Sequence, residues 1–528
     1  MATTISTPDN VAATTLRVTN PRNGEELYTI IEPDATAIEA VFTTARETAG
    51  TISAMTVRQR LDALQKMSDY ILEHKESIID RIVSETGKTR AEALLTEIFS
   101  TLDLIQYYGK TAERDLADQK VPTPVILFGK KSRIFLEPLG TVLIISPWNY
   151  PFNLSMTPII TALVTGNSVV FKPSEYTPLK GLLEEIFDGS GFPKDIVQVV
   201  YGGKNTGRQL IDQQPNKVFF TGSEAAGKAI MAHCAQYLIP VELELGGKDP
   251  FIVFEDANIP RAANGALWGS YTNCGQTCTS VERIIVHESI YDKFVETLVD
   301  EMKHLKTPLQ HTPNCHPNDM DMGCMTADFQ VAKVEEQIDD AIAKGAKIYI
   351  GGKRQDDSHN IPPTLIGNVT PDMIMYAEET FGPVAIVIPF KDEAEAIRLA
   401  NDTRYGLSSS VWTDDLVRAE RVARAIVTGN VSINNVLATQ GNAALPFGGT
   451  KASGMGRYKG TVGLHSFSNI KSVMIDKNSG RFEPIWYPYT AEKYALLQRL
   501  VDSAFKGTIL QTIFVGLGLE RLEKKRHY

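Results

Sequence analysis

Short, continuous apolar runs separated by helix-like stretches constrain the fold of this 528-residue chain more than any other feature. The first four runs are TVLIIS (141–146), SVVF (168–171), IVQVV (196–200) and KVFF (217–220). Strands that are buried on both faces of a parallel sheet have such runs, whereas half-exposed strands alternate apolar and polar residues. A second series follows at 250–254, 283–287, 347–352, 384–390 and 430–435. We therefore predict an α/β protein that binds ligands beyond the carboxyl ends of its strands.

Outside these runs the chain is helical near both ends. From Val57 to Tyr108, apolar residues recur at spacings of three and four with charges between them, which predicts a long amphipathic helical region. After Arg481, Pro484 and Pro488 predict a turn-rich link into two helical pieces. A helix from Thr490 would gather five apolar side chains on one face: Leu496, Leu497, Leu500, Val501 and Ala504.

The last apolar run, TILQTIFVGLGL at 508–519, has two interpretations. It is too short to span a bilayer, which takes about 20 residues. In the first interpretation, it is a helix packed on the protein's own surface. In the second, it lies in a membrane interface, because the following ERLEKKRHY carries basic residues that attract anionic lipid. Peripheral membrane contact is therefore one of two open expectations.

Charge and cysteine content exclude several classes of protein. The net charge is −10 and no basic stripe is present, which argues against a nucleic-acid partner. Five cysteines form an odd and sparse set, which is untypical of a disulfide-stabilised secreted protein. The first residues have neither the charged nor the apolar region of a secretory signal. We therefore expect a cytoplasmic location.

Two of the cysteines, Cys274 and Cys278, lie four positions apart in NCGQTC. A metal site would need a second pair or a His and Cys cluster at ligand spacing, and the neighbouring sequence has none, so we predict no metal. A disulfide across this short spacing is geometrically awkward. Each thiol can then be a buried packing residue or a nucleophile.

Several further motifs follow the predicted strands. They are SPWNYP (146–151), KPSE (172–175), TGSEAAGK (221–228), ELGGKDP (244–250), EETFGPV (378–384) and PFGGTKASGMGR (446–457). In order, type and spacing, these segments and NCGQTC resemble the NAD(P)-dependent aldehyde dehydrogenase superfamily from about residue 20 to 480.

The resemblance implies a fold with three parts and a tail. A Rossmann-type NAD-binding domain would take residues 1–119 and 137–246, and an α/β catalytic domain residues 247–466. A small β bridging element for oligomerisation would take 120–136 and 467–480, followed by a helical tail at 481–528. Because family members pair through the bridging element, a homodimer or homotetramer is expected.

The resemblance also implies a mechanism. Cys278 corresponds to the nucleophile that adds to the aldehyde, and Cys274 to a packing residue beside it. The side-chain amide of Asn149, with a backbone N–H, corresponds to the donors that stabilise the oxyanion. Glu244 corresponds to the base that activates water to hydrolyse the thioester. The same glutamate argues against a member that transfers the acyl group to coenzyme A.

The remaining positions implied by the resemblance concern the cofactor and the substrate. A helix N-terminus at Gly222 and Ser223 would hold the pyrophosphate, although the sequence lacks GxGxxG. Glu175 would accept a ribose hydroxyl and repel a 2′-phosphate, which favours NAD with NADP as the alternative. The other cofactor positions are Trp148, Lys172, Glu379 and Phe381. Trp148 would also line a hydrophobic substrate tunnel, together with Tyr271 and Phe447.

The segment GRYKG (456–460) with Tyr458 resembles the class 3 and fatty aldehyde dehydrogenase branch. We therefore predict a hydrophobic substrate, a medium- or long-chain aliphatic aldehyde that is oxidised to the acid. Apocarotenoid or aromatic aldehydes are the alternative. A catalytically silent member with a binding or structural role is a third interpretation, which the retained Asn149, Glu244 and Cys278 disfavour.

Overall fold

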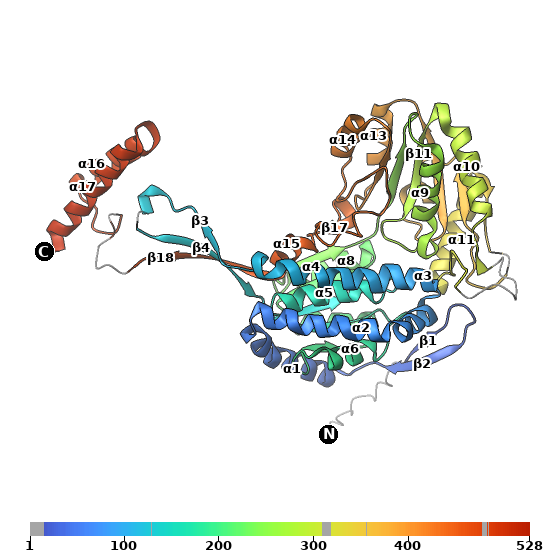
Figure 1. Ribbon diagram of the computed structural model, residues 1–528, viewed down its shortest axis with the longest axis horizontal. Helices are drawn as coiled ribbons and strands as arrows, with labels where there is room; N and C mark the ends of the chain where they lie inside the picture. Colours follow the sequence, from blue (N-terminus) through green and yellow to red (C-terminus); the bar gives the residue numbers. More distant parts are fainter. Residues whose placement is uncertain are drawn as a thin grey trace, which may run out of the picture. The chain divides into compact units, whose positions relative to one another are not determined.

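The computed structural model describes residues 15–127, 129–308, 318–354, 356–477, 483 and 485–527. They form two compact units (Figure 1). The larger unit comprises Met1–Asp115 and Pro138–Ser468, and the smaller unit comprises Leu116–Glu137 and Asn469–Tyr528.

The first sheet of the larger unit has six strands in the order β17-β9-β8-β5-β6-β7. All are parallel except β17, which pairs antiparallel with β9. Their bounds are β5 Thr141–Ile145, β6 Ser168–Lys172, β7 Val197–Val199, β8 Lys217–Thr221, β9 Val241–Glu244 and β17 Gly454–Met455. This is the doubly wound arrangement of a dinucleotide-binding domain, in which a ligand site lies where the strand order reverses, beside β5.

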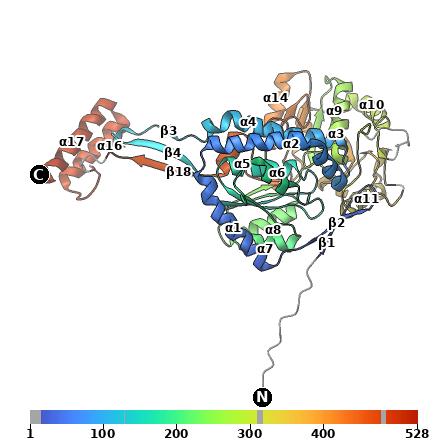
Figure 2. The same ribbon diagram turned by 60° about the horizontal axis from the view of Figure 1, so that its bottom comes forward.

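Helices cover both faces of this sheet (Figure 2). One face carries α1 (Ala35–Ala54), α7 (Lys204–Asp212) and α8 (Glu224–Ala235). The other carries α5 (Asn153–Val164) and α6 (Leu182–Ser190), with α2 (Val57–Thr86) and α4 (Ser100–Asp115) stacked outside them. Burial on both faces explains why the strands are uninterrupted apolar runs, with Val142, Leu143 and Ile144 fully buried.

The second sheet has seven strands in the order β12-β13-β14-β11-β10-β15-β16, and only β12 is antiparallel to its neighbour. Its strands are β10 Asp249–Val253, β11 Val281–His287, β12 Lys347–Ile350, β13 Thr364–Gly367, β14 Val384–Phe390, β15 Ser410–Trp412 and β16 Ser432–Ile433. One core cluster packs α9 (Ile259–Tyr271), α10 (Tyr291–Lys303) and α11 (Asp328–Ala343) against it. The other packs α13 (Glu393–Asn401) and α14 (Leu416–Ala425).

The two sheets meet near the predicted domain boundary. Residues 246 and 247 lie between β9 and β10, which belong to different sheets. The later segment from Gly454 returns to the first sheet as β17, and α15 (Gly460–Ser466) packs on α4 and α5. The C-terminal part of the predicted catalytic domain therefore also packs on the first sheet.

The structure corrects two sequence predictions in this unit. The helical region predicted from Val57 to Tyr108 is interrupted, because Gly87 takes a φ of 75° and ends α2. A three-residue turn of helix (α3, Arg90–Glu92) and a π-helical segment (η1, Ala93–Phe99) precede α4. Strands β9, β13 and β15 were not predicted, because they are short and contain buried polar residues or glycine in place of a long apolar run.

Three further short elements belong to the larger unit. A hairpin of β1 (Thr15–Thr19) and β2 (Glu26–Ile31) precedes α1. A short helix, α12 (Ile374–Ala377), precedes β14.

The smaller unit holds a three-stranded sheet in the order β18-β4-β3 and two helices. Its elements are β3 Gln119–Val121, β4 Lys131–Pro138, β18 Ser468–Ile475, α16 Ala491–Lys506 and α17 Ile509–His527. The helices pack on each other, and Lys493 Nζ lies 2.6 Å from a Glu523 carboxylate oxygen in their buried interface. Of the predicted apolar face of α16, Leu500 is buried but Val501 and Ala504 are exposed.

None of the described helices combines the length and apolarity needed to cross a bilayer. The homodimer or homotetramer stays a prediction.

Candidate active site

The loop that carries Cys278 has an unusual backbone. Between α9 and β11, Asn273 and Cys274 have φ values of 53° and 57°, and Gly275 has a φ of 69°. Left-handed backbone at residues other than glycine costs on the order of 1–3 kcal/mol each and persists only where the surroundings impose it. A side chain at position 275 would overlap the carbonyl oxygen of Gly382. Tertiary contacts therefore set the shape of this loop.

Asn149 lies directly against the loop. Its side-chain amide donates a hydrogen bond to the carbonyl of Gln276 at 2.9 Å, and its own backbone carbonyl accepts one from the Asn273 amide at 3.0 Å. A primary amide has two N–H donors, and among the described residues only the Gln276 carbonyl accepts one of them, so the second can bind a ligand. The structure thus places a buried amide donor beside the segment that ends at Cys278.

Cys278 lines two cavities. The larger has a volume of about 660 Å³ and is bounded by the ends of the first sheet. It is lined by Asn149, Glu244 and all seven residues predicted to bind the cofactor: Trp148, Lys172, Glu175, Gly222, Ser223, Glu379 and Phe381. With Cys278, residues from six separate motifs therefore line one cavity. Four of these motifs lie at the ends of strands of the first sheet, as expected for a ligand site of this fold, whereas Glu379 and Phe381 precede β14.

The smaller cavity has a volume of about 240 Å³, and Leu154 lines it as well as the larger one. Its walls include Phe447 and Tyr458. Phe447 is one of two residues that were predicted to line only the substrate tunnel. Tyr271, the other, lies elsewhere. Its side chain is 2% exposed in the hydrophobic core and donates a hydrogen bond to the Thr364 carbonyl at 3.0 Å.

Sequence reasoning missed most of the residues that line the smaller cavity. Leu95 and Phe99 come from η1, and Trp268 comes from the exposed face of α9. All three are more than half exposed, so they form an apolar mouth. In the sequence, the only indication of this mouth is that the three apolar residues lie outside the buried faces of η1 and α9. Phe329 of α11, which packs edge-on against Trp148 in the larger cavity, was missed as well.

Glu244 is a buried carboxyl without a partner. It ends β9, is 3% exposed, and neither of its carboxylate oxygens has a hydrogen-bond partner among the described residues. Burial and the neighbouring Glu242 raise its pKa well above the ordinary carboxyl value. The carboxylate form of Glu244 is therefore less favoured than that of a carboxyl group in water.

The pKa of the Cys278 thiol is raised as well. Burial and the carboxylates of Asp249, Glu379 and Glu244 raise its pKa above the ordinary thiol value. Cys274 is fully buried, and its pKa is raised by burial as well. The described cysteines are free thiols, and Cys278 is the one among them that is partly exposed.

The larger cavity fits a dinucleotide. Ser223 caps the N-terminus of α8, where backbone N–H groups suit a pyrophosphate. The Lys172 ammonium lies 3.6 Å from a Glu175 carboxylate oxygen at one wall, and both can bond ribose hydroxyls. Glu379 accepts the Gly247 N–H at 2.9 Å, and burial raises its pKa to about 7. The Trp148 and Phe381 rings, 5.4 Å apart, supply an apolar wall.

The sequence is similar to a known family and to individual proteins of established activity. The family model described as "Aldehyde dehydrogenase family" matches residues 9–473. The chain is 40% identical to 4,4′-diapolycopene aldehyde oxidase of Methylomonas sp, over 93% of this chain and 91% of that protein. It is 36% identical to the mitochondrial succinate-semialdehyde dehydrogenase of Oryza sativa subsp. japonica, over 87% and 86% of the two chains.

A solved structure matches too. The betaine aldehyde dehydrogenase of Staphylococcus aureus in complex with NAD+ superposes with a TM-score of 0.82 at 34% identity. The match covers 90% of this chain and 94% of that one.

The geometry of the thiols predicts a labelling pattern. We expect iodoacetamide to alkylate Cys278 before Cys234, Cys274 or Cys324, because those three are buried. Since the thiolate is the reactive form, the rate should keep rising above the pH of about 8.5 at which an ordinary thiol is half ionised. Peptide mapping by mass spectrometry across pH, with Cys278→Ala as control, measures both. Earlier labelling of Cys274 would contradict the assignment of the accessible thiol.

Proposed function

Because the chain belongs to the aldehyde dehydrogenase family, we propose that Cys278, Asn149 and Glu244 oxidise an elongated apolar aldehyde to its carboxylic acid. The enzyme is NAD(P)-dependent. The observation that carries the proposal is the position of Cys278, whose thiol borders the dinucleotide-sized cavity on one side and an apolar cavity on the other. An aldehyde in the smaller cavity and a cofactor in the larger one would meet at this sulfur.

The first half of the reaction uses Cys278 and Asn149. The sulfur adds to the carbonyl carbon, and the thiol proton is released. The carbonyl oxygen becomes an oxyanion, which the free N–H of the Asn149 amide can stabilise because the donor is already oriented. NAD(P)+ held in the larger cavity would supply the hydride acceptor for this adduct. A thioester then remains on Cys278.

Glu244 serves the second half. A water molecule must lose a proton to attack the thioester, and the carboxylate of Glu244 is the base that lines the cavity beside Cys278. Its oxygens are not held by other described groups, so they are free to bond a water molecule. Because its pKa is raised, the fraction in the base form grows as the pH rises.

The substrate class is inferred from the smaller cavity. Tyr458 and Phe447 pack edge-to-face at 5.6 Å in its wall, and the mouth is formed by the exposed Leu95, Phe99 and Trp268. An aldehyde longer than the cavity would lay its chain along this mouth and bury apolar surface. These contacts support a medium- or long-chain aliphatic aldehyde, as in the class 3 and fatty aldehyde dehydrogenase branch.

A polyene aldehyde is the second candidate. The similarity to a diapolycopene aldehyde oxidase favours it, and a polyene would use the same apolar mouth. The kcat/KM values for propanal, decanal, hexadecanal, benzaldehyde and retinal separate the candidates. An aliphatic-aldehyde enzyme should prefer decanal or hexadecanal, whereas an enzyme for polyene aldehydes should prefer retinal, which has a rigid conjugated chain.

The catalytic roles predict two different defects. Cys278→Ala should abolish aldehyde oxidation while the dissociation constant of NAD stays unchanged, whereas Cys274→Ala should keep most activity.

Glu244→Gln should give a burst of NADH followed by a slow steady rate, because acylation proceeds and hydrolysis does not. In the wild type the steady rate should rise with pH above the ordinary carboxyl range, and in Glu244→Gln this rise should be absent. Stopped-flow absorbance measures all of these; an unchanged steady rate in Glu244→Gln would remove Glu244 from the mechanism.

The mouth of the smaller cavity predicts a chain-length effect. Trp268→Ser should lower kcat/KM for hexadecanal about tenfold, because burying an aromatic side chain against a ligand contributes about 1.5–3 kcal/mol. The value for propanal should be unchanged. Val462→Ser is the matched control, since Val462 is similarly exposed but lines neither cavity. Equal losses on both aldehydes would show that the mouth does not select long chains.

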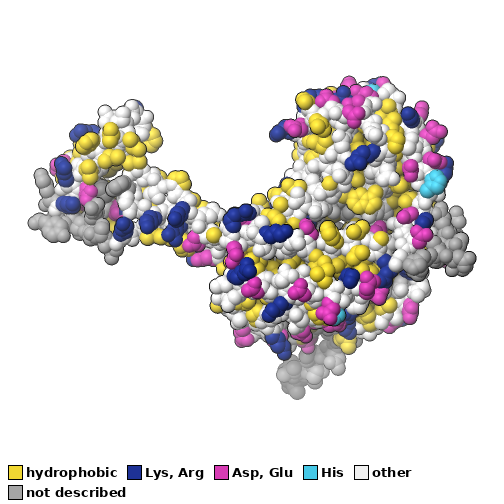
Figure 3. Space-filling model, in the orientation of Figure 1, with side chains coloured by type: hydrophobic (Ala, Val, Ile, Leu, Met, Phe, Trp, Pro, Cys, Tyr) yellow, Lys and Arg dark blue, Asp and Glu magenta, His cyan; other side chains and the backbone are white. Residues whose placement is uncertain are grey.

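We also propose that the tail contacts a membrane surface. Hydrophobic side chains gather over α16 and α17 (Figure 3), and six of them are exposed around the turn between the helices: Phe505, Ile509, Leu510, Ile513, Phe514 and Leu517. Such a face can lie in a lipid interface without spanning it.

The tail proposal predicts weaker vesicle binding when this face is made polar. We expect the triple variant Phe505→Ser, Leu510→Ser, Phe514→Ser to sediment less with anionic phosphatidylserine vesicles than the wild type, with propanal oxidation unchanged. Tyr494→Ser, an exposed residue of α16 outside the turn, is the control. Equal sedimentation of all three proteins would rule out a lipid contact at this face.

A further inference from the structure

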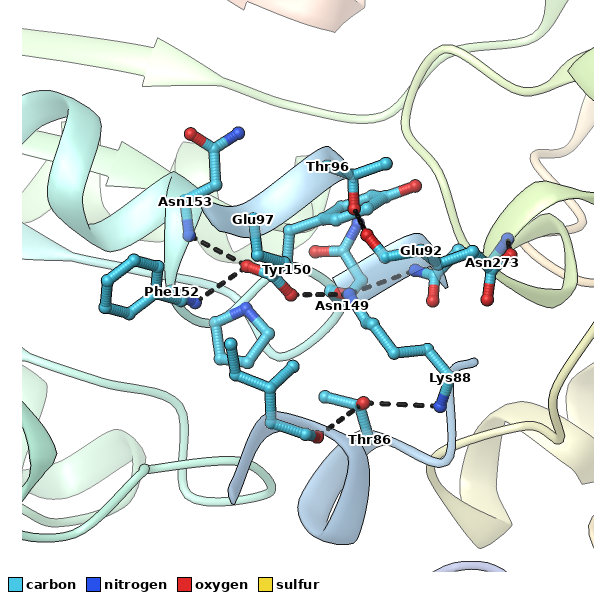
Figure 4. Close-up of polar contacts among 12 residues, drawn as sticks. Thr86, Lys88, Glu92, Thr96, Glu97, Asn149, Tyr150, Phe152, Asn153 and Asn273 are labelled. Atoms are coloured by element: carbon cyan, nitrogen blue, oxygen red, sulfur yellow. Dashed lines mark hydrogen bonds and ion pairs between the residues drawn. The ribbon is translucent and has the colours of Figure 1, made fainter. Parts of the chain in front are cut away.

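Three charged side chains that sequence reasoning did not select point from one short segment toward both catalytic loops (Figure 4). They are Lys88, Glu92 and Glu97, which lie where α2 ends and η1 begins. The side chains of Lys88 and Glu97 are 0% exposed. Charges are rarely withdrawn from water unless each has partners, so the partners show what this segment does.

Glu97 holds the start of α5. One of its carboxylate oxygens accepts the backbone N–H groups of Phe152 and Asn153 at 3.0 and 2.8 Å. The first residues of this helix have no capping side chain of their own, because Phe152 occupies the N-cap position. Glu97 therefore supplies from a distance the negative charge and the acceptor that a helix N-terminus requires. The chain between β5 and α5, which contains Asn149, is fixed at this end.

Lys88 holds the same chain at Asn149 itself. Its ammonium lies 2.5 Å from the other Glu97 oxygen and donates to the Asn149 carbonyl at 2.9 Å. It also lies 4.1 Å from the centre of the Tyr150 ring. The Asn149 carbonyl receives a second bond from the Asn273 amide. The Asn149 peptide is thereby fixed in both position and rotation.

Glu92 holds the opposite loop. Its carboxylate accepts the backbone N–H of Asn273 at 2.5 Å and that of Thr89 at 2.9 Å. Asn273 is the first of the residues with left-handed backbone that lead to Cys278. One segment thus bonds the oxyanion loop through Lys88 and Glu97, and the nucleophile loop through Glu92.

We propose that Lys88 and Glu97 are positioning residues, which together with Glu92 set the distance between the Asn149 amide and the Cys278 sulfur. The inference rests on the proposed roles of Asn149 and Cys278. Lys88 and Glu97 line neither cavity, so they act through Asn149 and not on the aldehyde. Leu95, Thr96 and Phe99 of the same segment line the smaller cavity, so the clamp and the substrate wall are one piece of chain.

The test measures acylation separately from binding. In Glu97→Gln the side chain keeps its shape and an acceptor but loses the charge that pairs with Lys88. We expect the burst rate of NADH formation with propanal to fall about 10- to 100-fold, since small misplacements of a catalytic group have effects of this size. The dissociation constant of NAD, measured by fluorescence, should change less than about twofold, because neither residue lines that cavity.

Two further variants separate positioning from general loss of structure. Glu85→Gln is the matched control: Glu85 is a buried carboxyl of α2 that accepts hydrogen bonds from Tyr28 and from the Leu179 N–H, away from both catalytic loops. Its burst rate should stay near the wild-type value. The double variant Lys88→Met, Glu97→Gln leaves neither charge unpaired in the interior, so it folds if Glu97→Gln does not. It should show the same slow burst, because the bond to the Asn149 carbonyl is gone.

A double-mutant cycle with Asn149→Ala tests whether Glu97 changes the burst rate through Asn149. If Glu97 acts through Asn149, Glu97→Gln should slow the burst in the wild-type background and have no further effect in the Asn149→Ala background. Equal fold-losses in both backgrounds would overturn the clamp. A wild-type burst rate in Asn149→Ala alone would instead overturn the proposed role of Asn149, so the two failures are distinguishable.

Discussion

Two opposite charges withdrawn from water, on Lys88 and Glu97, lie behind the catalytic loops and meet at 2.5 Å. Removing one partner of such a pair leaves a buried charge and destabilises a protein by about 3–5 kcal/mol, so both groups are bound to their places. Lys88 also donates to the Asn149 carbonyl, and Glu97 also accepts the backbone N–H groups of Phe152 and Asn153. The ion pair thereby fixes the backbone that carries the Asn149 side-chain amide.

Burial has a second consequence at the centre of the site. The same exclusion of water that strengthens these hydrogen bonds raises the pKa of both Glu244 and Cys278, because the charged forms lose their hydration. The thiolate of Cys278 and the carboxylate of Glu244 are both less favoured here than in water.

The two cavities beside Cys278 are built from different kinds of element. The larger is built from strand ends and the N-terminus of α8, elements whose geometry suits a dinucleotide in many chains of this fold. The smaller is built from η1, α9 and the loop around Phe447, which are irregular or peripheral. In the proposed function, the cofactor is therefore bound by the sheet, whereas the substrate is bound by segments that can change in sequence without disturbing the sheet.

The sequence by itself determined the α/β class, because short continuous apolar runs are typical of strands buried in a parallel sheet. The residues predicted for the larger cavity came from the resemblance of the motifs to a known family, which named them without giving their positions in space. The sequence did not reveal β9, whose buried Glu242 and Glu244 disguise a strand, nor the interruption of the first helical region at Gly87. Only the tertiary structure placed Tyr271 in the core and Trp268 at the mouth, although both lie on α9. Which face of a helix borders a cavity depends on partners far along the chain, and periodicity within the helix cannot specify them.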